Sequence, residues 1–236
     1  MGALRNRSER DRQSGISLIE LLVSMVVMGI LSTMILLVWF TLQSSYASSE
    51  QNAFQRDDAR QALWRMAAEI RDAQGVGGGA PVTSASANTI VFTTSFNNAG
   101  NTNQPTDPTA PDTNVHRVRY SYDPDPSVRT MYRTEDTDFD GSFADENRAV
   151  YLKNVVNGSV ASVYSEGSYT DTPVFRYSYY DTQGTLRTVN SLTAAGVDTS
   201  QLLNVQIRLL VDVKPNKSPT YMDLQTTVQP RNALRS

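Results

Sequence analysis

The chain has 236 residues, of which 39% are hydrophobic and 19% are charged, with a formal net charge of −3 and no cysteine. This length allows a globular domain with its own core in addition to a membrane helix. The absence of cysteine excludes disulfide bonds and a thiol nucleophile, and the slightly negative charge argues against nucleic acid as the main partner, since nucleic-acid binding normally relies on clustered Lys and Arg.

Residues 1–15 form a short polar stretch whose charges are mostly positive. An apolar run follows, and from Leu21 to Leu42 it contains no Asp, Glu, Lys, Arg or Pro. As a helix this run would be roughly 33 Å long, compared with about 30 Å for the hydrocarbon core of a bilayer. Because positive residues stay on the cytoplasmic side, we predict a cytoplasmic leader at 1–15 and a single-pass transmembrane helix at 16–42, with the rest of the chain outside. The charged residues of the leader are Arg5, Arg7, Arg10 and Arg12, against Glu9 and Asp11.

Glu20 is an acidic residue near the start of this apolar helix. Because an ionised side chain costs about 2.5–3.5 kcal/mol at the centre of a membrane helix, an acid in such a segment is a candidate functional residue. The apolar run contains no Lys or Arg to pair with it. The nearest suitable cation is a new amino terminus, formed by cleavage between Gly15 and Ile16 and supplied by a neighbouring copy of the chain. Alternatively, Glu20 only reaches out to the membrane surface, as amphipathic side chains do.

The residues around this acid resemble the processing site of type IV prepilins and type II secretion pseudopilins: Gly15-Ile16-Ser17-Leu18-Ile19-Glu20-Leu21-Leu22. The resemblance implies that a prepilin peptidase cuts after Gly15 and methylates the amino terminus of Ile16, and that Glu20 pairs with a terminal amine during filament assembly. It also implies the other partners: membrane lipid before assembly, other pilins or pseudopilins through the amino-terminal helix, and an assembly platform in the inner membrane. Ile16 stands where Phe is commonest, and the first proline is Pro81, so the mid-helix proline of major pilins is missing.

Residues 43–74 continue the helical pattern in an amphipathic form. Apolar residues recur every three or four positions, while the other face is charged. We therefore predict that the membrane helix continues as an amphipathic half over 43–74 and stops at a Gly/Pro/Ser linker over 75–87. The apolar stripe comprises Ala59, Leu63, Met66, Ala67, Ile70 and Ala73, and the polar face comprises Arg56, Asp57, Arg60, Gln61, Arg65, Glu69, Arg71 and Asp72.

Residues 88–236 contain short alternating segments that are typical of β-strands. The clearest is Leu203 to Val213, where apolar residues alternate with Arg208 and Asp212, so that one face is expected to be buried and the other wet. A sheet with one apolar face and a helix with one apolar stripe complete each other. We predict an α+β fold in which the long amino-terminal transmembrane and amphipathic helix packs on an antiparallel β-sheet, as in pilins. The predicted strands are 88–96, 116–122, 128–133, 149–155, 160–164, 174–180, 185–189, 203–213 and 221–228.

Three short segments of this downstream half resemble the PilW and PulJ branch of minor pilins and J-type pseudopilins. The resemblance implies a minor subunit that primes assembly or lies near the tip, in contrast to the bulk filament subunit. An alternative is a tip-located adhesin or DNA-uptake subunit whose loops at 97–114 or 135–147 bind a ligand. The segments are Met131-Tyr132-Arg133, Phe175-Arg176-Tyr177-Ser178-Tyr179-Tyr180-Asp181 before Gly184, and Val228-Gln229-Pro230-Arg231-Asn232.

An acid occupies every second position before Gly141, which is the spacing of oxygen ligands at the start of an EF-hand calcium loop. The twelfth position of such a loop is normally Glu but is Asn147 here. The sequence therefore leaves two alternatives open, a variant Ca²⁺ site and an ordinary acidic loop. The candidate ligands are Asp136, Asp138 and Asp140, and the acids that could close a variant loop are Asp145 and Glu146.

His116 is the single histidine of the chain, and it lies in a predicted strand. One His and no Cys provide neither a thiol nucleophile nor a multi-His metal site. The glycines at 75–79 lack the Lys and the Ser or Thr of a phosphate loop. We therefore predict a structural protein with no catalytic residue and no cofactor apart from the calcium alternative. Besides the filament subunit and the tip-located binding subunit, a third possible function is that of an anchored extracellular enzyme. No pairing of a nucleophile with a base supports this third possibility.

Overall fold

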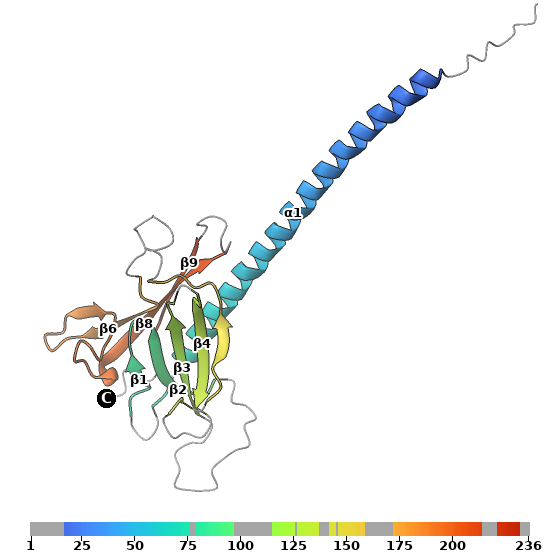
Figure 1. Cartoon of the computed structure of the whole chain (residues 1–236). Coiled ribbons are helices and arrows are strands. Elements are labelled where there is room, and N and C mark those ends of the chain that lie inside the picture. Colours follow the sequence, from blue (N-terminus) through green and yellow to red (C-terminus); the bar gives the residue numbers. More distant parts are fainter. Residues whose placement is uncertain are drawn as a thin grey trace, which may run out of the picture. The chain divides into compact units, whose positions relative to one another are not determined.

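The structure is a computed structural model that describes residues 17–75, 79–96, 115–125, 127–136, 142–144, 146–158, 172–213 and 221–231. The chain divides into two compact units, residues 1–51 and residues 52–236. The first unit contains the apolar part of one long helix. The second unit contains the end of that helix and all the described strands (Figure 1).

The helix, α1, is continuous over 54 residues from Leu18 to Arg71. Near its amino terminus it contains an 18-residue window with a mean hydropathy of 2.7, and no side chain of that window is buried. Large apolar side chains there are widely exposed, for example Leu18 at 83% and Ile35 at 69%. By length and composition, this part of α1 can cross a membrane.

The carboxyl-terminal end of α1 is fastened to other parts of the second unit. The last carbonyl groups of a helix lack partners within the helix, and the backbone N–H of Arg231 donates to the carbonyl oxygen of Arg71 at 2.9 Å. Asp72 follows the helix and accepts a hydrogen bond from Ser95 Oγ at 2.8 Å. A Cβ at Gly75 would overlap a backbone carbonyl four residues later. The turn after the helix therefore requires the glycine that the sequence analysis interpreted as a helix stop.

Nine strands in the described part of the chain form two antiparallel sheets. The strands are β1 (Val82–Ala85), β2 (Thr89–Thr94), β3 (His116–Asp123), β4 (Thr130–Asp136), β5 (Ala149–Leu152), β6 (Phe175–Tyr180), β7 (Leu186–Val189), β8 (Leu202–Asp212) and β9 (Tyr221–Val228), and a 3₁₀ turn, η2 (Thr199–Gln201), precedes β8. Sheet A has the order β1-β2-β3-β4-β5, and sheet B has the order β7-β6-β8-β9 (Figure 1). The predicted α+β fold is confirmed, but the described strands form two sheets where one was expected. The predicted strand at 160–164 lies outside the described residues.

β1 lies inside the stretch that the sequence analysis assigns to a linker, residues 75–87, and that part of the prediction is wrong. Val82 pairs with Phe92, and Ala85 pairs with Ile90, both in β2. Val82 and Ala85 are fully buried. With so few apolar residues among Ser, Thr and Pro, the segment resembles a loop in composition, and only the presence of β2 beside it makes it a strand.

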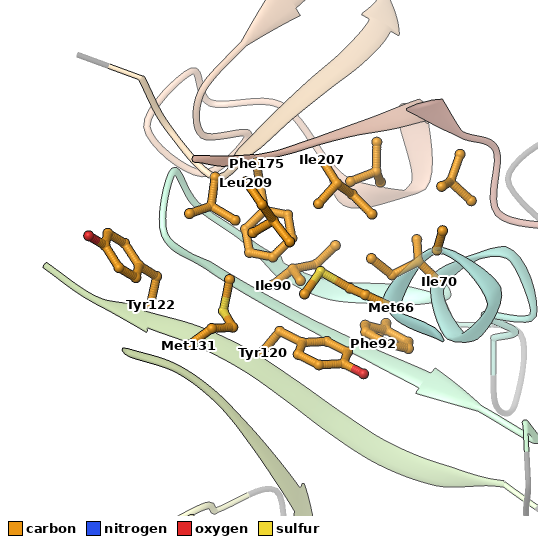
Figure 2. Packing of buried hydrophobic residues seen from close by; sticks show 14 of the residues in the cluster. Met66, Ile70, Ile90, Phe92, Tyr120, Tyr122, Met131, Phe175, Ile207 and Leu209 are labelled. Carbon is orange, nitrogen blue, oxygen red and sulfur yellow. The ribbon is translucent and has the colours of Figure 1, made fainter. Parts of the chain in front are cut away.

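The core of the second unit lies between the two sheets, and α1 packs against the same core (Figure 2). The rings of Phe92 and Tyr120 stack with their centroids 6.1 Å apart. Burying one such large apolar side chain stabilises the fold by about 1.5–3 kcal/mol, so this shared core holds the last turns of α1 on the sheets. The fully buried side chains include Ile90, Phe92, Tyr120 and Met131 from sheet A, Phe175, Ile207 and Leu209 from sheet B, and Met66 and Ile70 from α1.

Asp212 is expected on the wet face of β8, but its side chain is only 2% exposed. The chain that follows β5 covers this end of β8. The backbone N–H of Asp212 donates to the carbonyl of Asn154 at 2.9 Å, and that of Val156 donates to the carbonyl of Leu210 at 2.8 Å. Val156 and Leu210 then form a second small apolar cluster. The prediction of a wet outer face is therefore wrong at this end of the strand.

Candidate functional site

The amino-terminal end of α1 carries the predicted assembly acid, Glu20, in its first turn. The side chains around it are apolar and exposed, with Ile19 at 70% and Leu21 at 49%. None of the ion pairs in the described part of the chain involves Glu20. The predicted cleavage site, Gly15 and Ile16, lies outside the described residues. The roles of these three residues in processing and assembly therefore stay predictions.

Glu20 also occupies a local position that the sequence analysis missed. Ser17 directly precedes α1, and its carbonyl oxygen accepts a helical hydrogen bond from the backbone N–H of Leu21 at 3.1 Å. Ser and Glu three residues apart have the spacing of a capping box, in which the two side chains satisfy free N–H groups at the helix start. A negative charge is also favourable at this end of the helix dipole. A test of Glu20 must therefore separate its charge from its capping position.

The first acid of the predicted calcium loop, Asp136, is the last residue of β4 and is fully buried. Its Oδ2 lies 3.5 Å from Nη1 of Arg117 on β3. Asp138 and Asp140 lie outside the described residues, and within the described part of the chain no three His, Cys, Asp or Glu side chains gather as a metal site. Calcium binding stays a prediction, and a bound ion would share Asp136 with Arg117.

A buried charge cluster lies where the sequence analysis expects an exposed helix face. Glu69 of α1 is 0% exposed. Its Oε2 accepts hydrogen bonds from Tyr120 Oη at 2.8 Å and from Arg133 Nε at 3.1 Å. Its Oε1 accepts a hydrogen bond from Arg65 Nε at 3.0 Å. Tyr120 belongs to β3 and Arg133 to β4, so the cluster fastens α1 to sheet A, and the assignment of Glu69 to the exposed face is wrong.

The electrostatics of this cluster indicate a structural role. Burial alone would lower the pKa of Arg133, but Glu69, Tyr120 and Glu135 act together in the opposite direction, and the net shift is upward. Burial, reinforced by the charge of Glu69, raises the pKa of Tyr120 well above its usual value. Burial likewise raises the pKa of Tyr151, to about 12. General acid–base catalysis at neutral pH requires a pKa moved toward 7, and these three shifts move away from it.

His116 lies next to the same cluster and is 5% exposed. Its Nε2 is 3.8 Å from Oε1 of Glu135, whose other oxygen accepts a hydrogen bond from Arg133 at 3.0 Å. Its Nδ1 is buried and has no hydrogen-bond partner among the described residues. Burial lowers the pKa of His116, although the charge of Glu135 acts in the opposite direction. The fold therefore favours the neutral imidazole.

The sequence alone could have revealed the capping position of Glu20, but it could not have revealed the buried cluster around Glu69. The Ser17 and Glu20 spacing is local, and a search for capping boxes would have found it. The cluster around Glu69 is not local, since Tyr120 is 51 positions away in the sequence. Only the pairing of Arg65 with Glu69, one helical turn apart, is visible in the sequence, and it is equally typical of an exposed helix face.

Comparison with known proteins addresses the amino-terminal segment. Residues 10–36 match the family model described as the prokaryotic N-terminal methylation motif. The matched range includes Gly15, Ile16 and Glu20, together with much of the apolar part of α1. A search of curated proteins gives no significant match. The matched motif and the long apolar helix support the type IV prepilin and pseudopilin family, and they support a type IV pilin-like or pseudopilin-like precursor.

Proposed function

We propose that this chain is a minor pilin or pseudopilin, a structural subunit that assembles into, or primes, a type IV pilus or a type II secretion pseudopilus. The proposal depends on one coincidence, the methylation motif over residues 10–36 at the start of a helix whose apolar part is exposed. Such a surface is stable in lipid or against other apolar chains and is unfavourable in water. The resemblance to the PilW and PulJ branch and the missing mid-helix proline favour a minor subunit.

In this proposal the chain enters the inner membrane with its amino terminus in the cytoplasm, as the basic leader indicates. Prepilin peptidase then cleaves after Gly15 and methylates Ile16, and the assembly platform transfers the subunit from lipid to the filament. Glu20 pairs with the amino terminus of a neighbouring subunit and so fixes the axial position of one helix against the next. This mechanism requires positioning and needs no catalytic group in the chain.

The mature amino terminus tests the first step of this proposal. Mass spectrometry of the protein from membranes of cells with an active prepilin peptidase should find a methylated Ile16 as the first residue. In cells that lack the peptidase, the same protein should retain residues 1–15. A protein that begins at Met1 in both strains would refute the proposed processing and, with it, the filament role.

Variants of Glu20 test the assembly step. Glu20→Gln keeps a side chain that suits a capping box but removes the charge, whereas Glu20→Ala removes both. We expect both variants to insert and to be cleaved normally, and both to be depleted from sheared filaments. Normal incorporation of the Gln variant together with loss of the Ala variant would assign Glu20 to helix capping and contradict the pairing with a terminal amine.

A further inference from the structure

Within the second unit, a groove of about 620 Å³ runs between α1 and β5. The helix wall is a single stripe that includes Gln55, Asp58, Gln61 and Arg65, and the strand wall is the continuous stretch 150–154. The two walls meet through a hydrogen bond from Tyr151 Oη to the carbonyl oxygen of Ala62 at 2.7 Å, between groups that are 89 positions apart in the sequence. The volume lies within the range of about 300–1,000 Å³ that is usual for binding sites.

β5 is an outer strand of sheet A (yellow in Figure 1), and among the described strands it pairs with β4 alone. The free edge of such a strand presents unpaired N–H and C=O groups, which proteins usually protect with charged residues or proline. β5 contains Ala149, Val150, Tyr151 and Leu152, with no charge and no proline, and Val150 is 54% exposed. The composition of β5 therefore leaves its edge open to pairing with another extended chain.

The two walls of the groove have similar lengths. The helix wall from Gln55 to Arg65 spans about 15 Å at 1.5 Å per residue. The strand wall at 150–154 spans about 13 Å at 3.3 Å per residue. A groove of this length, with a strand edge along one side, fits about five residues of extended polypeptide better than it fits a rounded surface.

Three polar groups in the groove have unused binding capacity. Gln55 Oε1 is buried and has no hydrogen-bond partner among the described residues, and leaving a buried acceptor unpaired costs about 1–3 kcal/mol. Lys153 on the strand wall and Asp58 on the helix wall form none of the ion pairs in the described part of the chain, whereas the charge of Arg65 is already paired with Glu69. The groove thus provides an acceptor for one donor, a cation for one carboxylate and a carboxylate for one cation.

We propose that this groove binds an extended segment of another polypeptide that carries one acidic and one basic residue and adds as a strand to the free edge of β5. The segment donates a hydrogen bond to Gln55, directs a carboxylate at Lys153 and directs a cationic group at Asp58. In this mode of recognition, main-chain hydrogen bonds give affinity and alternate side chains give specificity. The proposal goes beyond the filament role and is independent of it, because it involves neither Gly15 nor Glu20.

The test uses the full chain in detergent micelles and a displayed library of short random peptides. We expect enriched peptides to alternate apolar and polar residues and to carry Asp or Glu together with Lys or Arg, and a synthetic copy to slow hydrogen exchange of the amides at 149–153. Val150→Lys, which places a charge on the edge, should weaken binding about tenfold or more. Leu186→Lys is the matched control, because Leu186 lies on the edge strand β7 and is also 54% exposed; it should leave binding unchanged.

The charge of Lys153 provides a second, independent readout. Lys153→Glu should lose affinity for the enriched peptide and gain affinity for the same peptide with Lys in place of its acid. Failure to enrich any peptide, binding that neither protects β5 nor responds to Val150→Lys, or an unchanged charge preference would each overturn the proposal. Full protection of the amides at 149–153 in the chain alone would also overturn it, because the edge would already be paired. Loss of processing at Gly15 affects none of these readouts, so the two proposals fail separately.

Discussion

Glu69→Gln is a small change in shape that removes the charge opposite Arg133. Glu69 is 0% exposed and the Arg133 side chain is 15% exposed, so water cannot replace the lost partner. Removing one member of a buried ion pair typically costs about 3–5 kcal/mol, because the other charge stays buried without compensation. Glu135 lies 3.0 Å from Arg133 and retains part of that compensation. We therefore expect the free energy of unfolding of the second unit to fall by about 3 kcal/mol, near the lower end of the range.

Native-state hydrogen exchange on the full chain in detergent micelles measures this change. The backbone amides of β3 and β4 report the free energy of opening around the cluster. Glu135→Gln is the matched control: it removes an equal charge from the same Arg133, but the Glu135 side chain is 34% exposed, so the expected loss is only about 0–1 kcal/mol. Combining Glu69→Gln with Arg133→Met leaves no buried charge unpaired and should restore most of the lost stability.

Two results would refute this reasoning. If Glu69→Gln costs no more than the Glu135→Gln control, the ion pair does not hold α1 against sheet A. If the double variant is less stable than Glu69→Gln alone, the cost comes from lost packing or lost hydrogen bonds, and an uncompensated charge on Arg133 is not its cause.

Three further predictions follow from the same structure. The fold lowers the pKa of His116, so as the pH falls the unfolded chain binds a proton at His116 at a higher pH than the folded chain does, and stability should decrease below about pH 6.5. His116→Gln should remove this pH dependence in thermal melts, and a dependence that persists in the variant would contradict its assignment to His116. Millimolar calcium should raise the melting midpoint if the acidic loop binds it, and joint Asp138→Asn and Asp140→Asn should abolish the rise, whereas no rise in the parent chain rules out the calcium site. Tyr177 Oη donates to the carbonyl of Ser86 at 2.8 Å and links sheet B to the residue after β1, so Tyr177→Phe should lower the free energy of unfolding by about 1 kcal/mol in urea titrations. An unchanged midpoint would mean that this hydrogen bond does not hold the sheets together.

The strands could be predicted from the sequence wherever apolar and polar residues alternate along the strand and the apolar residues are the buried ones. In β3, the period of two places Val118, Tyr120 and Tyr122 on one face, and all three are buried. The same holds for the inner face of β8, where Val205 and Ile207 are fully buried. A strand with one face on the core carries this information within itself, because successive side chains point to opposite sides.

The prediction failed where a distant segment determines the environment of a residue. Glu69 is buried because β3 and β4 approach α1 at that turn, and Asp212 is buried because the chain after β5 crosses the end of β8. For the same reason the groove could not be predicted, since its two walls come from α1 and β5. The methylation motif at 10–36 was accessible from sequence because such a signal is a short, contiguous stretch that needs no tertiary contact.

The energetics of the proposed assembly depend on Glu20 more than on the apolar surface of α1. Lipid chains are as apolar as the side chains of a neighbouring helix, so moving an apolar helix from lipid into a helical filament gains little from the hydrophobic effect. Glu20 differs, because it lacks an ion-pair partner in the described part of the lone chain and would gain the amine of Ile16 from a neighbouring subunit, in surroundings of low dielectric where such a pair is strong. Shortening one exposed apolar side chain, as in Leu36→Val, should therefore leave the fraction of the subunit found in filaments nearly unchanged. Glu20→Gln should lower that fraction and raise the fraction that stays in the membrane.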